Sequence, residues 1–289
     1  MIDAVLSAVF FAQVLHIALP YALAAMGGAV TERAGVIDLA LEAKLLFGAF
    51  AAAAVAHATG SPYLGVLGGM GAGMAVAGLQ IWCSLVLAAN QVIVGVALNL
   101  LALGGTRFLL QLLYHEGANS PPVPGLGHAV ATNPIMWLAV VAAIALPFAI
   151  KRTRWGLRLR AAGDRPDALV AVGVAPLRTR LHAALVGGAL AGAGGAQLSL
   201  AVGGFVADMS SGRGYIALAM VILAGWRPAL AALCCAAVAL GEAINIQLQV
   251  ADVGIPHELA QLLPYVLTLL VLVIAGGKHG KPPRSLGRV

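Results

Sequence analysis

Residues 31–50, TERAGVIDLALEAKLLFGAF, place five charged side chains beside a long apolar run: Glu32, Arg33, Asp38, Glu42 and Lys44. Asp38 and Glu42 are four residues apart and would share one face of a regular helix, with Lys44 close enough to compensate part of their charge. Alternatively, this segment is interrupted inside a membrane and its backbone groups line a polar path. Because ionisable groups inside a membrane usually face a cavity or a partner, we expect Asp38, Glu42 and Lys44 at an interrupted helix near a transport pathway and not facing lipid.

Further polar residues interrupt other apolar runs, with Asn99 and Arg107 in one run and Glu242, Asn245, Gln247 and Gln249 in another. Glu242 and Asn245 are three residues apart, so they share a helix face. For each of these residues a structural role is as good an explanation as a transport role. The candidate residues of the pathway are Asp38, Glu42, Lys44, Asn99, Glu242 and Asn245.

Patterns that would indicate enzymatic chemistry are absent from the sequence. There is no phosphate-binding G-x-x-x-x-G-K-[ST] motif, and the seven histidines are scattered without H-E-x-x-H spacing. The three cysteines, Cys83, Cys234 and Cys235, lie in apolar runs and have no metal-ligand spacing. The glycine-rich stretch 188–195, GALAGAGG, follows no strand, so it indicates close helix packing rather than a dinucleotide loop. We therefore expect neither a catalytic residue, nor a metal, nor a cofactor in this chain.

The composition excludes a soluble globular protein. Of 289 residues, 61% are hydrophobic and only 10% are charged, whereas soluble domains average about 25% charged residues. The apolar runs are continuous instead of alternating, which argues against a β-barrel. The sequence predicts an all-α polytopic membrane protein that forms one transmembrane domain, 1–289.

The positive charges predict the orientation. Eight of the 17 Lys and Arg residues fall in 151–181 and four in 278–289, so both segments are expected on the cytoplasmic side. An even number of crossings must then lie between them. The net charge of +6 is therefore a topology signal and does not indicate nucleic acid binding.

Nine transmembrane or partly spanning segments are predicted, within a range of eight to ten. The candidates are 4–28, 34–58, 63–88, 91–113, 134–150, 182–203, 213–225, 228–249 and 259–276. The segment 213–225 is too short to cross about 30 Å of hydrocarbon, so we expect a short or broken helix. The odd total places the N-terminus outside, 114–133 in an external loop and the C-terminus in the cytoplasm.

The basic loop 151–181 has the features of a folded element. Asp164 is expected to cap a short helix with Pro166 in its first turn, and Ala168, Leu169 and Val172 supply an apolar face. One interpretation is a loop that only sets topology. The other is a docking element for a cytoplasmic partner.

Four stretches resemble the permease subunits of binding-protein-dependent ABC importers, in the class that serves ribose-type sugars, branched-chain amino acids and nucleosides, and most closely its nucleoside branch. They are TERAGVIDLALEAKLLFGAF, NQVIVGVALNLLALGGTRFL, WGLRLRAAGDRPDALVAVGV and GRGYIALAMVILAGWRP. They occur in the family's order and together cover most of the chain.

The resemblance implies a permease of the cytoplasmic (inner) membrane that moves nucleosides or purine-like solutes by alternating access. Its implied partners are cytoplasmic ATPase subunits that carry ATP and Mg²⁺, an extracytoplasmic solute-binding protein and a second, paralogous permease in a heterodimer. Residues 157–173 would couple the permease to the ATPase. The residues assigned to this coupling loop are Arg158, Arg160, Gly163, Asp164, Arg165, Pro166, Ala168 and Gly173.

Some positions depart from the nucleoside branch. Asp38, Ala40, Ala43 and Lys44 stand where that branch commonly has Asn, Gly, Gly and an apolar residue. The departures leave a simple-sugar solute open. An ion-coupled secondary transporter that uses Asp38, Glu42 or Glu242, and a channel or membrane scaffold, are the alternatives outside the family.

Overall fold

The computed structural model describes residues 8–127, 132–250 and 282–287. Within these ranges the chain is helical, without a β-strand, and seven helices are long and apolar enough to cross a membrane. These are α2 (Ala8–Arg33), α3 (Leu41–Thr59), α4 (Pro62–Ile81) with a π-helical extension (Trp82–Val86), α5 (Gln91–Tyr114), α6 (Pro134–Arg152), α9 (Pro176–Val202) and α11 (Pro228–Val250). Three shorter helices are α7 (Arg154–Asp164), α8 (Pro166–Ala171) and α10 (Arg213–Leu223).

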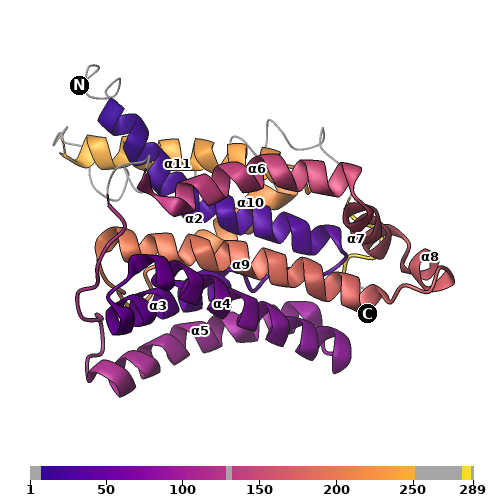
Figure 1. Cartoon of the computed structure of the whole chain (residues 1–289), viewed down its shortest axis with the longest axis horizontal. Coiled ribbons are helices and arrows are strands. Elements are labelled where there is room, and N and C mark those ends of the chain that lie inside the picture. Colours follow the sequence, from indigo (N-terminus) through magenta and orange to yellow (C-terminus); the bar gives the residue numbers. More distant parts are fainter. Residues whose placement is uncertain (1–7, 128–131, 251–281, 288–289) are drawn as a thin grey trace.

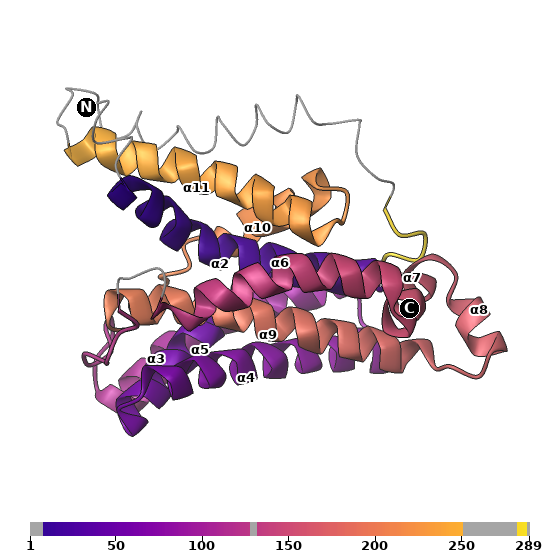
Figure 2. The same cartoon turned by 45° about the horizontal axis from the view of Figure 1, so that its top comes forward.

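Helix α9 is the centre of the bundle. It packs against α2, α3 and α4, while α11 and α10 pack against α2 on the other side. Figures 1 and 2 show α7 and α8 together beyond one end of the long helices. We call this the basic end, because the arginines of 151–181 gather there. The loop 115–127 lies at the opposite end, where it pairs with 203–207 through backbone hydrogen bonds.

Glycines allow α9 to approach its neighbours so closely that the backbones of the helices are in contact. A Cβ on Gly48 of α3 would lie 2.7 Å from the Cα of Gly192, and a Cβ on Gly69 of α4 would lie 3.0 Å from the carbonyl oxygen of Gly192. Gly188 makes a similar approach to Gly73. The interpretation of 188–195 as a helix-packing stretch is confirmed, in keeping with the use of small residues between membrane helices.

Replacing Gly192 with alanine is expected to lower the stability of the purified protein by about 1–3 kcal/mol, the usual cost of overpacking a core. The added Cβ would collide with backbone atoms of Gly69, which cannot rotate away. Thermal unfolding in detergent measures this loss. Gly71→Ala is the matched control, because open space surrounds that position; equal stability of the two variants would contradict the packing.

The predicted segments agree with the observed helices to within a few residues, except around residue 34 and at the start of α9, which begins at Pro176 instead of 182 and so takes the last residues of the predicted basic loop. The prediction of one helix over 34–58 is wrong at its start, because α2 continues to Arg33 and α3 begins only at Leu41. Helix α2 ends in a turn that contains Gly35, with φ +94°. A hydrogen bond from the backbone N–H of Gly35 closes this turn. The short helix over 213–225 is confirmed as α10. The segment 259–276 lies outside the described residues.

The basic loop contains two helices instead of one. Thr153 caps α7, accepting from the backbone N–H of Gly156 at 3.1 Å. Asp164 is the last residue of α7, so the prediction that it caps the following helix is wrong. Arg165 holds the cap position of α8 without a side-chain bond, and Pro166 begins the helix as expected.

Candidate functional site

An irregular segment, residues 34–40, connects α2 to α3 inside the bundle. The first turns of α3 lie against the interior of α9, since Gly195 contacts the backbone of Leu45. We call residues 34–40 the break. The interruption foreseen as one of two alternatives is therefore the one observed, and Asp38 and Glu42 do not share a helix face.

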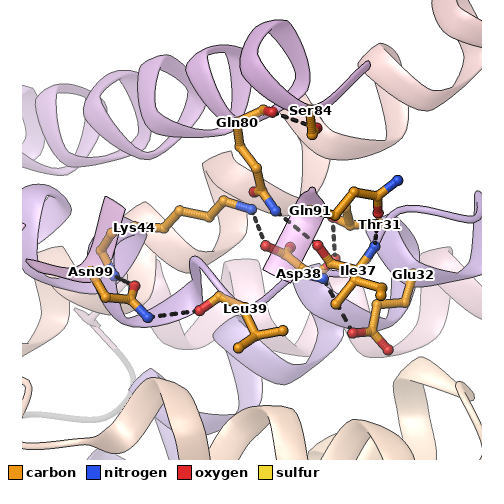
Figure 3. Close-up of polar contacts among 12 residues, drawn as sticks. Thr31, Glu32, Ile37, Asp38, Leu39, Lys44, Gln80, Ser84, Gln91 and Asn99 are labelled. Carbon is orange, nitrogen blue, oxygen red and sulfur yellow. Dashed lines mark hydrogen bonds and ion pairs between the residues drawn. The ribbon is translucent and has the colours of Figure 1, made fainter. Parts of the chain in front are cut away.

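Side chains from two other helices satisfy the backbone of the break (Figure 3). The N–H of Ile37 donates to Oε1 of Gln91 on α5 at 2.8 Å, and its carbonyl oxygen accepts from Nε2 of Gln80 on α4 at 2.9 Å. The N–H of Asp38 donates to Oε1 of Glu32 at 3.3 Å. Irregular backbone is tolerated at membrane depth only where such partners exist.

Asp38 and Lys44 form an ion pair across the start of α3, and both side chains are 0% exposed. The second carboxylate oxygen of Asp38 has no hydrogen-bond partner in the described structure, nor has Oε1 of Gln80. The pair is therefore buried, although one of its carboxylate oxygens is not bonded. Pairing neutralises the two charges, because burying either one alone in lipid or in an apolar core would cost much free energy.

Glu42 caps the N-terminus of α10. Its Oε1 accepts from Oγ of Ser210 at 2.6 Å and from the N–H of Gly212 at 2.8 Å, and its Oε2 accepts from the N–H of Gly214 at 2.6 Å. Glu42 also lies in the first turn of α3. Its negative charge therefore faces the positive dipole ends of two helices whose N-termini meet inside the bundle, α3 and the short α10.

Asn99 of α5 completes this junction. Its Oδ1 accepts from the N–H of Ala43 at 2.9 Å, and its Nδ2 donates to the carbonyl oxygen of Leu39 at 2.9 Å and to the hydroxyl of Tyr215 at 3.0 Å. Ala40, the residue before α3, provides no cap of its own. Asn99 therefore supplies the cap that the sequence around α3 lacks, and connects it to α10.

Glu242 belongs to a separate cluster. It pairs with Arg213 of α10 at 2.9 Å and accepts from the hydroxyl of Tyr21 of α2 at 2.8 Å. The two charged side chains are 23% and 22% exposed, so this pair is more open than Asp38 and Lys44. Asn245, one turn further along α11, accepts from Nε2 of Gln249 instead. The candidate pathway residues thus do not form one group. Glu42 and Asn99 meet at the start of α10, whereas the other contacts are separate: Asp38 with Lys44, Glu242 with Arg213, and Asn245 along α11.

The basic end brings α7 against the start of the break. Gly163 lies so close to the carbonyl oxygen of Arg33 that no side chain fits between them. Ser285 of the predicted tail donates from its N–H at 2.8 Å and its Oγ at 2.7 Å to the carbonyl oxygen of Gly163. The N–H of Gly287 then reaches the carbonyl oxygen of Gly35 at 3.2 Å. The tail therefore fastens α7 to the turn that begins the break.

The other coupling-loop candidates lie around this contact. Arg158, Arg160, Gly163 and Asp164 are on α7, Arg165 is between the helices, Pro166 and Ala168 are on α8, and Gly173 follows it with φ +74°. All except Gly163 are at least partly exposed. This surface of α7 and α8 is available to a partner.

Sequence reasoning missed several residues of the junction. Gln80 and Gln91 bind the backbone of the break and Ser210 binds Glu42, but none of the three belongs to a recognisable spacing pattern. Trp226 donates from its indole N–H to Oε2 of Glu32 at 2.6 Å and so connects the end of α10 to the end of α2. An isolated glutamine in an apolar run was the available signal, because a polar group in a membrane helix needs a partner.

Fold and site together define a polytopic membrane transport protein, with helix N-termini that meet at buried charges inside the bundle and a folded basic loop at one end. The chain belongs to the family described as branched-chain amino acid transport system / permease component, which matches residues 10–272. Members are permease components of ABC importers, and this chain is one of them. No solved structure matches it.

Three curated relatives are similar over much of the chain. A putative glucose ABC transporter permease of Haloferax volcanii is 36% identical over 71% of this chain and 67% of its own length. A nucleoside ABC transporter permease of Lactococcus lactis is 30% identical over 95% of this chain and 94% of its own. A guanosine ABC transporter permease of Bacillus subtilis is 29% identical over 92% and 91%. The resemblance to the permease class is confirmed.

Proposed function

We propose that this chain forms the solute pathway of an importer for nucleosides or purine-like solutes. The supporting observation is that two relatives named for nucleoside or guanosine transport match more than nine-tenths of the chain. A simple sugar is the second candidate, because the relative with 36% identity is named a putative glucose permease. An ion-coupled transporter is no longer needed to explain the buried charges, which have partners inside the chain.

The solute is tested by reconstituting the chain with its ATPase, second permease and binding protein and measuring uptake. Radiolabelled guanosine is expected to accumulate, and unlabelled glucose is expected not to compete. A thermal-shift screen of the purified binding protein provides a second measurement. Glucose uptake that guanosine does not inhibit would overturn the nucleoside assignment and support the sugar.

We further propose that a separate cytoplasmic ATPase supplies the driving force. It would bind ATP and Mg²⁺ itself and dock on α7 and α8. The contact of Gly163 with Arg33 gives a route for movement, since any shift of α7 pushes on the end of α2 and the break behind it. Glu42 and Asn99 would then move with α3 and α10 beside the pathway, while Asp38 and Lys44 keep the break in shape. A second permease, a paralogue in a heterodimer, and a binding protein complete the importer.

Replacing Gly163 with alanine is expected to uncouple ATP hydrolysis from transport. The new Cβ would displace α7 from the carbonyl oxygen of Arg33, which cannot move without unwinding α2. Mutations along a coupling network change coupling by about 0.5–2 kcal/mol, so uptake per ATP should fall by about tenfold. Solute-stimulated ATPase activity and uptake are measured in the reconstituted complex.

Gly78→Ala is the matched control, because it makes the same change in a helix where nothing lies within 4 Å. Asp164→Asn is a second variant, which keeps the size of the side chain at the end of α7. Unchanged uptake per ATP in Gly163→Ala would contradict the proposed route from α7 to the break.

A further inference from the structure

Two cavities adjoin at the basic end and share Arg33 and Arg160 in their walls. The larger, about 1190 Å³, lies between α7 and the tail and includes Asp164. The smaller, about 460 Å³, lies between the ends of α2, α6 and α7 and the turn from α10 to α11. The charges in the wall of the smaller cavity are all of one sign.

Four cations from four elements line the smaller cavity: Arg33, Lys151, Arg160 and Arg227. Among the described residues no acidic side chain lines it, and none of the four cations forms an ion pair. Arg160 and Arg227 repel Arg33, and Asp164, which lines the larger cavity only, attracts it. Holding like charges together around a cavity costs free energy unless an anion joins them, and guanidinium groups suit a phosphate best.

The rest of the wall is apolar and belongs to membrane-spanning helices. Pro147 and Ile150 come from α6, and Leu230 comes from α11. Within two turns of Lys151, α6 also exposes Ile144 and Phe148. The cavity thus lies where an apolar helix surface changes to a basic rim, which is the arrangement of a basic headgroup pocket between membrane helices.

We propose that this cavity binds the headgroup of an anionic phospholipid, with its phosphate among Arg33, Arg160 and Arg227 and its acyl chains along α6 and α11. A soluble phosphate would use the same cations but would gain nothing from the apolar wall. An acidic segment of the partner ATPase would approach the exposed surface of α7 and α8 instead. A bound headgroup would join α7 to the end of α2, the two elements that carry movement to the break, and also to the end of α6 and the turn after α10.

Native mass spectrometry of the purified full-length chain tests the proposal, using phosphatidylglycerol and phosphatidylcholine with identical acyl chains. Phosphatidylglycerol is expected to bind at least about tenfold more tightly, since each nearby cation contributes about fivefold to anionic lipid binding. The double variant Arg160→Gln/Arg227→Gln should lose about 25-fold in affinity for phosphatidylglycerol and little for phosphatidylcholine. These two cations are chosen because neither makes an ion pair whose loss would unfold the chain.

Arg152→Gln/Arg154→Gln is the matched control, because it removes two exposed arginines of the same end that do not line the cavity. An equal loss in this control would overturn the site in favour of diffuse surface charge. Equal binding of the two lipids would also overturn it. Full displacement of the lipid by inorganic phosphate at low millimolar concentration would assign the cavity to a soluble anion, and loss of ATPase binding with unchanged lipid affinity would assign it to the partner.

Discussion

Replacing Lys44 with methionine is expected to destabilise the protein by about 3–5 kcal/mol, the cost of leaving one member of a buried ion pair uncompensated. Asp38 would then be a carboxylate without exposure to water, with one oxygen already lacking a partner. Methionine keeps the length of the side chain, so packing changes little. Thermal unfolding in detergent and the yield of folded protein measure the effect.

The double variant Asp38→Asn/Lys44→Met is expected to recover most of this loss, because it removes both charges together. Arg154→Met, a change at an exposed cation that lines neither cavity, serves as the control. If Lys44→Met unfolds at the same temperature as Arg154→Met, Asp38 and Lys44 do not form a buried ion pair. Uptake separates two roles: a purely structural pair leaves the double variant active, whereas a lysine that contacts solute does not.

The positions of the membrane helices followed from hydropathy, because a long apolar run has few other stable conformations in a bilayer. The break did not follow in the same way. Residues 34–40 are mostly apolar, so they extend the run of α3 and hide the point where the helix stops. The non-helical backbone is stable there because side chains distant in sequence form hydrogen bonds with it. They are Gln80, Gln91 and Asn99.

The role of Glu42 was similarly hidden. In sequence, its nearest charges are Asp38 and Lys44, which suggested one charged group. In the structure Glu42 faces away to residues 210–214, about 170 positions later, and Asp38 and Lys44 pair with each other. Spacing along one helix identifies neighbours on that helix. It does not indicate which other helix the fold places against a given side chain.

Replacing Glu42 with alanine is expected to loosen the start of α10 and to destabilise the protein by several kcal/mol. Three donors lose their acceptor, those of Ser210, Gly212 and Gly214, and each unsatisfied buried donor costs roughly 1–3 kcal/mol. Glu42→Gln keeps one carbonyl oxygen but turns an amide N–H₂ toward a donor, so its loss should be intermediate. Thermal unfolding ranks the three proteins.

Hydrogen exchange locates the effect, because the amides of Gly212 and Gly214 donate directly to the carboxylate of Glu42. Their exchange should accelerate strongly in Glu42→Ala, while that of α5, held through Asn99, changes less. Glu116→Ala removes an exposed carboxylate and should leave both regions unchanged. Protection at 212 and 214 that survives Glu42→Ala would show that α10 is held by its packing against α2 and α11, and that the carboxylate is free to serve the solute instead.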